Sequence, residues 1–153
     1  MEHLSFDRLH RINGIFAEMD ALYHQAALRL GLSDSALRVL YALYDGGGSC
    51  ALTAVCRQSG LSKQTVNSAL RKLEREGTIY LERAGGREKR ACLTAAGEAL
   101  AQRTVARLYA AESAAFSNWP EEEICAHIRY LESYLDAFRT QVARLQPGED
   151  EGQ

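Results

Sequence analysis

The sequence has no long apolar run, and this absence argues against a membrane-spanning helix. No segment approaches the roughly 18 uninterrupted apolar residues that such a helix needs. The N-terminal stretch also has no basic start followed by an apolar block, so we expect no secretory signal and a cytoplasmic location. A hydrophobic content of 46% and a charged content of 25% are typical of a globular protein that folds around a core.

Cysteine is scarce, and the motifs of catalysis are missing. The four cysteines, Cys50, Cys56, Cys92 and Cys125, form no CxxC pair and no dense disulfide framework. We expect free thiols in a reducing compartment, with Cys92 as the exposed one. The four histidines lack metal-ligand spacing, and no GxSxG, Walker or dinucleotide-binding motif occurs. We therefore expect no metal, no cofactor, no catalytic residue and no enzymatic activity.

Charge is unevenly distributed along the chain. Residues 57–94 contain nine Lys and Arg against four Glu, a net charge of +5; since the whole chain carries −2, the remainder carries −7. A basic middle between acidic flanks favours a segment that meets a polyanion. Charge alone leaves a solvated charged face as the alternative.

Two long helices with narrow apolar seams are predicted near the two ends of the chain. In both, apolar residues alternate at spacings of three and four. The first seam comprises Leu9, Ile12, Phe16, Met19, Tyr23, Ala26 and Leu30, and the last comprises Ile124, Ile128, Leu131, Leu135, Phe138, Val142 and Leu145. Because a seam must be buried by another helix, we expect a homodimer, with a monomeric helical bundle as the alternative.

The first half of the middle segment predicts two further helices. Gly31 ends the first long helix, and Ser33 or Asp34 caps the next. The apolar side of that helix comprises Leu37, Leu40, Tyr41 and Tyr44. After a glycine-rich loop, a short helix is expected from Ser49 to Arg57.

The second half predicts a helix followed by a β-hairpin. Gly60 makes a tight turn, and Ser62 caps a helix that ends at Gly77. Its inward residues are Val66, Ala69, Leu70 and Leu73. Two strands follow, with Ile79, Leu81, Ala91 and Leu93 facing inward. Thr94 then caps a long helix to about Ser117, and Pro120 occupies the first position of the last helix.

The helix after Gly60 is unusual because its first two turns carry hydrogen-bonding side chains. Helix, tight turn and helix is the helix-turn-helix layout, and the hairpin behind it forms a wing. A helix that enters the major groove by its N-terminal half needs side chains that match base edges and phosphates. The alternative is a polar solvent face on an ordinary helix.

At this point the chain resembles the MarR (multiple-antibiotic-resistance regulator) family of bacterial transcription factors. The resemblance is carried by "LSKQTVNSALRKLEREGTI", the wing, and "CLTAAGEAL" after the wing. It implies a mainly α fold with a small β-hairpin. The implied division is a helical dimerisation region over 1–30 and 95–145 and a winged helix-turn-helix DNA-binding domain over 31–94. The final stretch, "QPGEDEGQ", predicts a disordered tail over 146–153.

The resemblance also implies site residues on double-stranded DNA. Base contacts are expected from Gln64, Thr65, Asn67 and Ser68. Phosphate contacts are expected from Ser62, Lys63 and Arg71, and backbone contacts from Lys89 and Arg90. Arg87 matches the wing arginine that enters the minor groove, whereas the family's wing Asp is replaced by Gly85.

The mechanism implied by the resemblance is that of a homodimeric repressor on a pseudo-palindromic operator, released by a small aromatic or anionic effector. Phe16, Tyr23, Tyr41 and Tyr44 are candidates to line the effector pocket, and packing in the core is the alternative for these aromatic residues.

Two other functions remain open. One is a winged-helix module that binds protein, and the other is a ligand sensor that binds DNA weakly.

Overall fold

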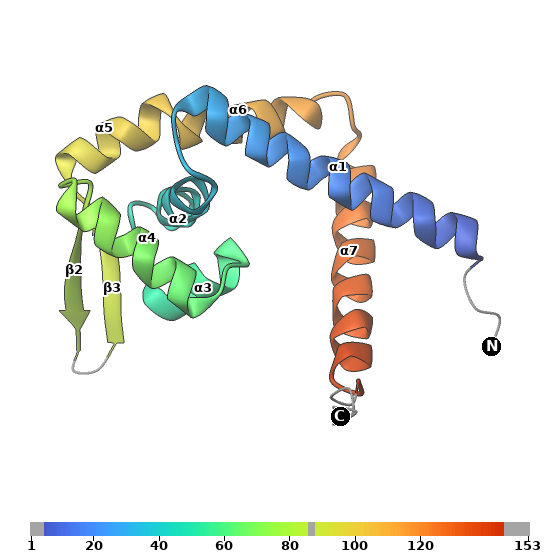
Figure 1. Cartoon of the computed structure of the whole chain (residues 1–153). Helices are drawn as coiled ribbons and strands as arrows, with labels where there is room; N and C mark the ends of the chain where they lie inside the picture. The colour runs from blue at the N-terminus through green and yellow to red at the C-terminus, as the bar shows by residue number, and fades with distance from the viewer. Residues whose placement is uncertain (1–4, 86–87, 146–153) are drawn as a thin grey trace, which may run out of the picture. The chain divides into compact units, whose positions relative to one another are not determined.

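A computed structural model describes residues 5–85 and 88–145 of the chain (Figure 1). The chain divides into two compact units, Met1–Ala111 and Glu112–Gln153. The fold is mainly helical with a small antiparallel sheet, as the sequence predicts. The expected tail, residues 146–153, lies outside the described residues. The division into a dimerisation region and a DNA-binding domain stays a prediction.

Capping residues fix the end of the first helix and the start of the second at the positions predicted from the sequence. Helix α1 runs over Phe6–Leu30 and ends at Gly31, which adopts a left-handed conformation with φ 70°. The Leu32 N–H then donates to the Ala27 carbonyl at 2.9 Å. Helix α2, Asp34–Asp45, begins at Ser33, whose hydroxyl accepts from the Ala36 N–H. Both predicted helices are therefore confirmed.

A third strand corrects the prediction for the segment after the glycine-rich loop. Ser49–Ala51 forms β1, and helix α3 begins only at Leu52 and runs to Ser59. The sheet has the order β1-β3-β2, with β2 over Ile79–Ala84 and β3 over Glu88–Leu93. Cys50 pairs with Ala91 on β3, so pairing with a distant strand overrides the local helical reading.

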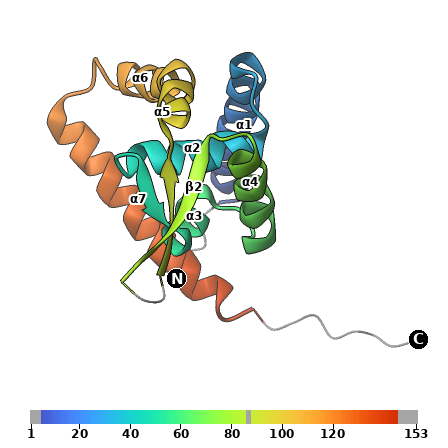
Figure 2. The same cartoon turned by 90° about the vertical axis from the view of Figure 1, so that its left-hand side faces the viewer.

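The hydrophobic core of the first unit surrounds α2, which packs against α1, α3, α4 (Lys63–Arg75) and the sheet (Figures 1 and 2). Leu37, Leu40 and Leu43 are almost fully buried. Ile79, Ala91 and Leu93 face this core as predicted, whereas Leu81 is 37% exposed. Leu81 pairs with the buried Ala91 and so lies on the predicted inward side of the sheet. It is less covered because β2 is an edge strand and Leu81 lies nearer the hairpin tip.

The long helix expected from Thr94 to Ser117 is broken. Thr94 caps α5, Ala95–Arg103, and α6 covers Val105–Ala115. Thr104 lies between them with φ −124° and ψ −89°, and its hydroxyl donates to the Leu100 carbonyl at 2.6 Å. A threonine that bonds back to the preceding turn competes with the helix ladder. The break leaves Val105 fully buried.

The second unit is dominated by helix α7, Glu121–Val142. Pro120 occupies its N-cap position, one residue before the position predicted. Three glutamates in the first turn favour the positive end of the helix dipole. From Ile128 to Leu145 the predicted seam is exposed.

Within the described residues, every helix is too short or too polar to cross a membrane.

Candidate functional site

Helix α4 is held so that one face packs on the core and the other stays open to solvent. Gly60 takes a left-handed conformation with φ 66°, which turns the chain between α3 and α4. The Ser62 hydroxyl accepts from the Thr65 N–H at 3.1 Å and caps α4. The buried face comprises Val66, Ala69, Leu70 and Leu73. Because this face is fixed by packing, the orientation of the opposite face is fixed as well.

The opposite face of α4 collects the residues that the resemblance assigns to DNA. All are exposed, and they are Ser62, Lys63, Gln64, Thr65, Asn67, Ser68 and Arg71. The hydroxyls of Ser62 and Thr65 lie 2.8 Å apart and share a hydrogen bond. The structure therefore brings seven predicted residues together on one surface, with hydroxyl, amide and cationic groups. Their role as DNA contacts remains a proposal.

The three predicted wing residues have different surroundings. Lys89 is exposed on β3. Arg90 is half-buried, and its guanidinium donates to the Ser49 hydroxyl at 3.0 Å, so it ties β3 to β1. Arg87 lies outside the described residues. Of the wing, Lys89 thus offers an open cation, whereas Arg90 has a structural partner already.

The thiols correct one sequence-based prediction. Cys92 is 4% exposed, and Cys125 is the exposed thiol. Cys92 does alternate away from the buried Ala91, but Tyr80 pairs opposite it on β2 and the side chain is buried. Burial first, and the neighbouring carboxylate of Glu82 second, raise the pKa of the Cys92 thiol. No group of three His, Cys, Asp or Glu that could hold a metal ion occurs within residues 5–85 and 88–145.

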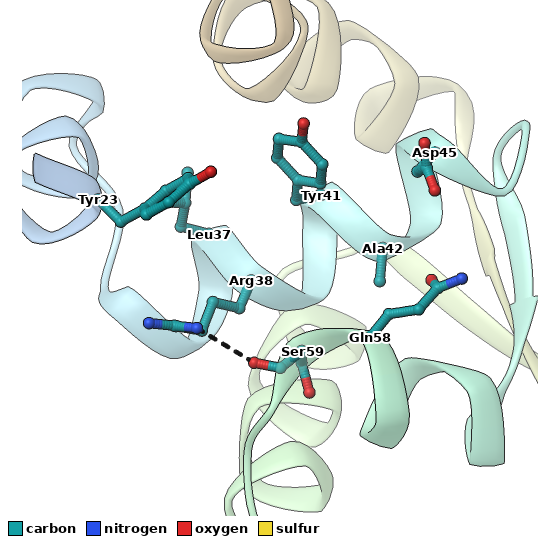
Figure 3. A pocket seen from close by; sticks show the side chains of 8 residues that line it. All are labelled: Tyr23, Leu37, Arg38, Tyr41, Ala42, Asp45, Gln58 and Ser59. Carbon is teal, nitrogen blue, oxygen red and sulfur yellow. Dashed lines mark hydrogen bonds between the residues drawn. The ribbon is translucent and has the colours of Figure 1, made fainter. Parts of the chain in front are cut away.

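A pocket of about 420 Å³ lies in the first unit, beside α2 (Figure 3). Its volume falls within the range of small-molecule sites, roughly 300–1,000 Å³. Residues from α1, α2 and α3 line it, namely Tyr23, Leu37, Arg38, Tyr41, Ala42, Asp45, Gln58 and Ser59. Tyr23 and Tyr41 were candidates from the sequence. Phe16 and Tyr44 are not among the lining residues, and Tyr44 meets Tyr109 edge-on instead.

Sequence reasoning missed the polar members of this pocket. Arg38, Tyr41 and Asp45 are spaced by three and four, so they share one face of α2. This periodicity is visible in the sequence, but nothing in it places the end of α3 beside that face. Gln58 and Ser59 approach α2 only because α3 packs on it.

Comparison with known proteins found a family model that matches the middle of the chain, and solved structures with a similar fold. Residues 30–90 match the sequence model of the MarR family. No curated protein matches the chain significantly. Among solved structures, a MarR family regulator from Neisseria meningitidis superposes with a TM-score of 0.79 at 17% identity, over 89% of this chain and 96% of that one.

Two further solved structures are informative through what they bind. The MepR–DNA complex of S. aureus is similar with a TM-score of 0.62 at 23% identity, over 89% of this chain and 99% of that one. Bordetella bronchiseptica BpsR, whose DNA binding is regulated by 6-hydroxynicotinic acid, is similar with a TM-score of 0.60 at 18% identity. That likeness covers 81% of this chain and 98% of BpsR. At these identities the likeness establishes the fold.

Proposed function

We propose that the protein is a dimeric, sequence-specific DNA-binding regulator of transcription, because residues 30–90 match the sequence model of the MarR family. We propose further that it represses its target genes and leaves a pseudo-palindromic operator when a small aromatic acid binds. The exposed polar face of α4 is the observation that carries the proposal.

That face has the composition that reading DNA requires. Gln64 and Asn67 are exposed and carry amides that can pair with both edge groups of adenine. Lys63 and Arg71 are exposed cations at the two ends of the same face, suited to phosphates. A helix that docked on another protein would be expected to present apolar anchors there. Between Lys63 and Arg71, the apolar residues Val66, Ala69 and Leu70 are all buried.

A dimer is supported by the apolar seams of α1 and α7. Leu9, Phe16 and Met19 on α1 are each at least 40% exposed, and so are Leu135 and Phe138 on α7. Seams of this length are normally buried by other helices. A two-fold dimer would set its two α4 helices one DNA turn apart, about 34 Å, and read two related half-sites.

The pocket beside α2 supports regulation by a small molecule. Aromatic walls from Tyr23 and Tyr41 suit a planar ring, and Arg38 suits an acid. BpsR, which has the same fold, responds to 6-hydroxynicotinic acid, a molecule of this kind. We assign the effector of this protein to the same broad class.

Selection of bound sequences from a random duplex library tests the central proposal. The purified full chain is used at about physiological salt, where phosphate contacts alone bind weakly. The expected result is a two-fold symmetric motif with half-sites one turn apart. Recovery of no motif by a folded, dimeric protein would contradict the proposal and favour a protein-binding module.

Three variants then assign the contacts. Asn67→Ala should cost about 1–3 kcal/mol on the selected site and relax specificity at one position. Lys63→Ala should weaken binding to all sequences. It should also reduce the slope of log affinity against log salt concentration by the amount that about one phosphate contact contributes. Arg87→Ala, chosen on the sequence resemblance alone, should also weaken binding to all sequences while leaving the dimer intact. Glu74→Ala, an exposed change nearer the end of the same helix, is the control.

A further inference from the structure

Arg38 connects the pocket to two other parts of the first unit. Its Nη1 donates to the Ser59 carbonyl at 3.3 Å (Figure 3), and its Nη2 donates to the Asp20 carboxylate of α1 at 3.3 Å. The same side chain lines the pocket. One guanidinium therefore touches α1, the end of α3 and the space in which a ligand would lie.

The Ser59 carbonyl stands at the turn that leads into α4. Ser59 is the last residue of α3 and is 2% exposed. Its hydroxyl donates to the Cys56 carbonyl at 3.2 Å and accepts from the Leu61 N–H at 3.3 Å. A cation at the C-terminal carbonyls of a helix is favourable because it meets the negative end of the dipole. Arg38 thus helps to hold the turn from which the Ser62 cap of α4 starts.

The charges of the pocket determine how an acid would lie in it. Arg38 and Asp45 are seven residues apart on one face of α2, which separates their backbones by about 10 Å. Figure 3 shows the two side chains at opposite ends of the pocket, with Tyr41 and Ala42 between them. Asp45 repels an acid at its end, whereas the planar fork of Arg38 can bind an acid through two parallel hydrogen bonds.

We propose that Arg38 binds the acid group of an aromatic ligand in this pocket and thereby releases the Ser59 carbonyl, so that an occupied pocket loosens the turn before α4. The inference deepens the proposed function, because it rests on regulation by a small aromatic acid. A bidentate acid engages the two terminal nitrogens that now serve Ser59 and Asp20. Ligand binding and the order of the turn therefore compete for one side chain.

Binding of a matched pair of probes tests the first half of the proposal. Calorimetry compares 6-hydroxynicotinic acid with its uncharged amide on the full chain. The acid should bind about tenfold tighter or more, since hydrogen bonds to a charged group are strong. Arg38→Gln should abolish this preference. Asp20→Asn should instead strengthen acid binding, because Asp20 competes for Nη2 but does not line the pocket.

Two controls separate loss of the contact from loss of the fold. Arg57→Gln removes an exposed cation from α3 outside the pocket and should leave the preference for the acid unchanged. Arg38→Lys keeps the charge without the planar fork and should retain only part of the preference. Equal binding of both probes, binding of neither probe, or an acid preference that survives Arg38→Gln would overturn the assignment of Arg38.

Hydrogen exchange tests the second half. Compared with the ligand-free protein, the acid-bound protein should show faster amide exchange over residues 59–66, and the uncharged amide should cause no such change. Arg38→Gln should show the faster exchange without any ligand. Unchanged exchange in the acid-bound protein would refute the coupling to α4. Neither measurement uses DNA, so a failure here is distinguishable from a failure of the DNA-binding proposal.

Discussion

At the scale of single residues, the thiols differ in reactivity for physical reasons that can be tested. Burial raises the pKa of the Cys50 thiol and of the Cys92 thiol, so both hold less thiolate at neutral pH than an ordinary cysteine. Cys125 is exposed on α7. Since the thiolate is the reactive form, iodoacetamide should label Cys125 first in the native protein. Cys50 and Cys92 should react slowly, and faster as the pH rises.

Peptide mass spectrometry after brief labelling gives the order directly, and urea-unfolded protein is the control in which all thiols should react alike. Labelling of Cys92 as fast as Cys125 would contradict the protection of Cys92 by burial beside strand β2. The raised pKa values of Cys50 and Cys92 also affect stability. At neutral pH both thiols are protonated, and their contribution to the free energy of unfolding is fully present. Their contribution should be lost as the pH rises through their folded-state pKa values.

Ser62 has two expected roles that different substitutions separate. Its hydroxyl caps α4, so Ser62→Ala should lower the free energy of unfolding by about 1 kcal/mol. Ser62→Asp keeps a capping oxygen and should leave the stability nearly unchanged, while its negative charge repels a phosphate. Urea unfolding and DNA titration of both variants give the two readouts. A stable Ser62→Asp variant with undiminished DNA affinity would remove Ser62 from the interface.

At the scale of elements, the packing of α5 on the start of β2 depends on a glycine. A Cβ at Gly97 would overlap the Thr78 carbonyl, so Gly97→Ala should destabilise the fold by about 1–3 kcal/mol. Gly14→Ala is the matched control, because a Cβ there meets no atom within 4 Å. That control should stabilise α1 by about 0.5–1 kcal/mol. Thermal unfolding compares the two, and equal effects would contradict the contact at Gly97.

Elements set by local chemistry are those that the sequence predicts well. The end of α1 and the starts of α2 and α4 follow from Gly31, Ser33 and Ser62, whose effects reach only a few residues. The polar face of α4 is equally local, because its buried face follows a helical period. The prediction that the polar side chains at positions 63, 64, 67, 68 and 71 face away from the core therefore needed no knowledge of distant contacts.

Elements set by distant partners are those that the sequence predicts poorly. Strand β1 exists because it pairs with β3, some 40 residues later. Cys92 is covered by a neighbouring strand, and the break at Thr104 depends on a back-bonded hydroxyl and a buried Val105. The pocket has the same origin, since Arg38 meets Ser59 only after α2 and α3 have packed.

At the scale of the whole molecule, the proposed dimer depends on apolar seams that one chain leaves exposed. Leu135 on α7 is 47% exposed, so Leu135→Lys should not disturb the fold of a single chain. In a two-fold interface each protomer would bury one unpaired lysine, at a cost of about 3–5 kcal/mol each. The variant should therefore be monomeric at concentrations where the wild-type protein is a dimer.

Sedimentation equilibrium measures this change, with Glu132→Lys on the same helix as the control for added charge. DNA affinity should fall together with dimerisation, because one α4 helix then binds one half-site without the help of the second. The change in DNA affinity distinguishes a dimer that binds an operator with both recognition helices from a dimer that has no role in DNA binding. If Leu135→Lys were monomeric and still bound the full operator as tightly as the wild-type protein, the two-fold arrangement of recognition helices would be wrong.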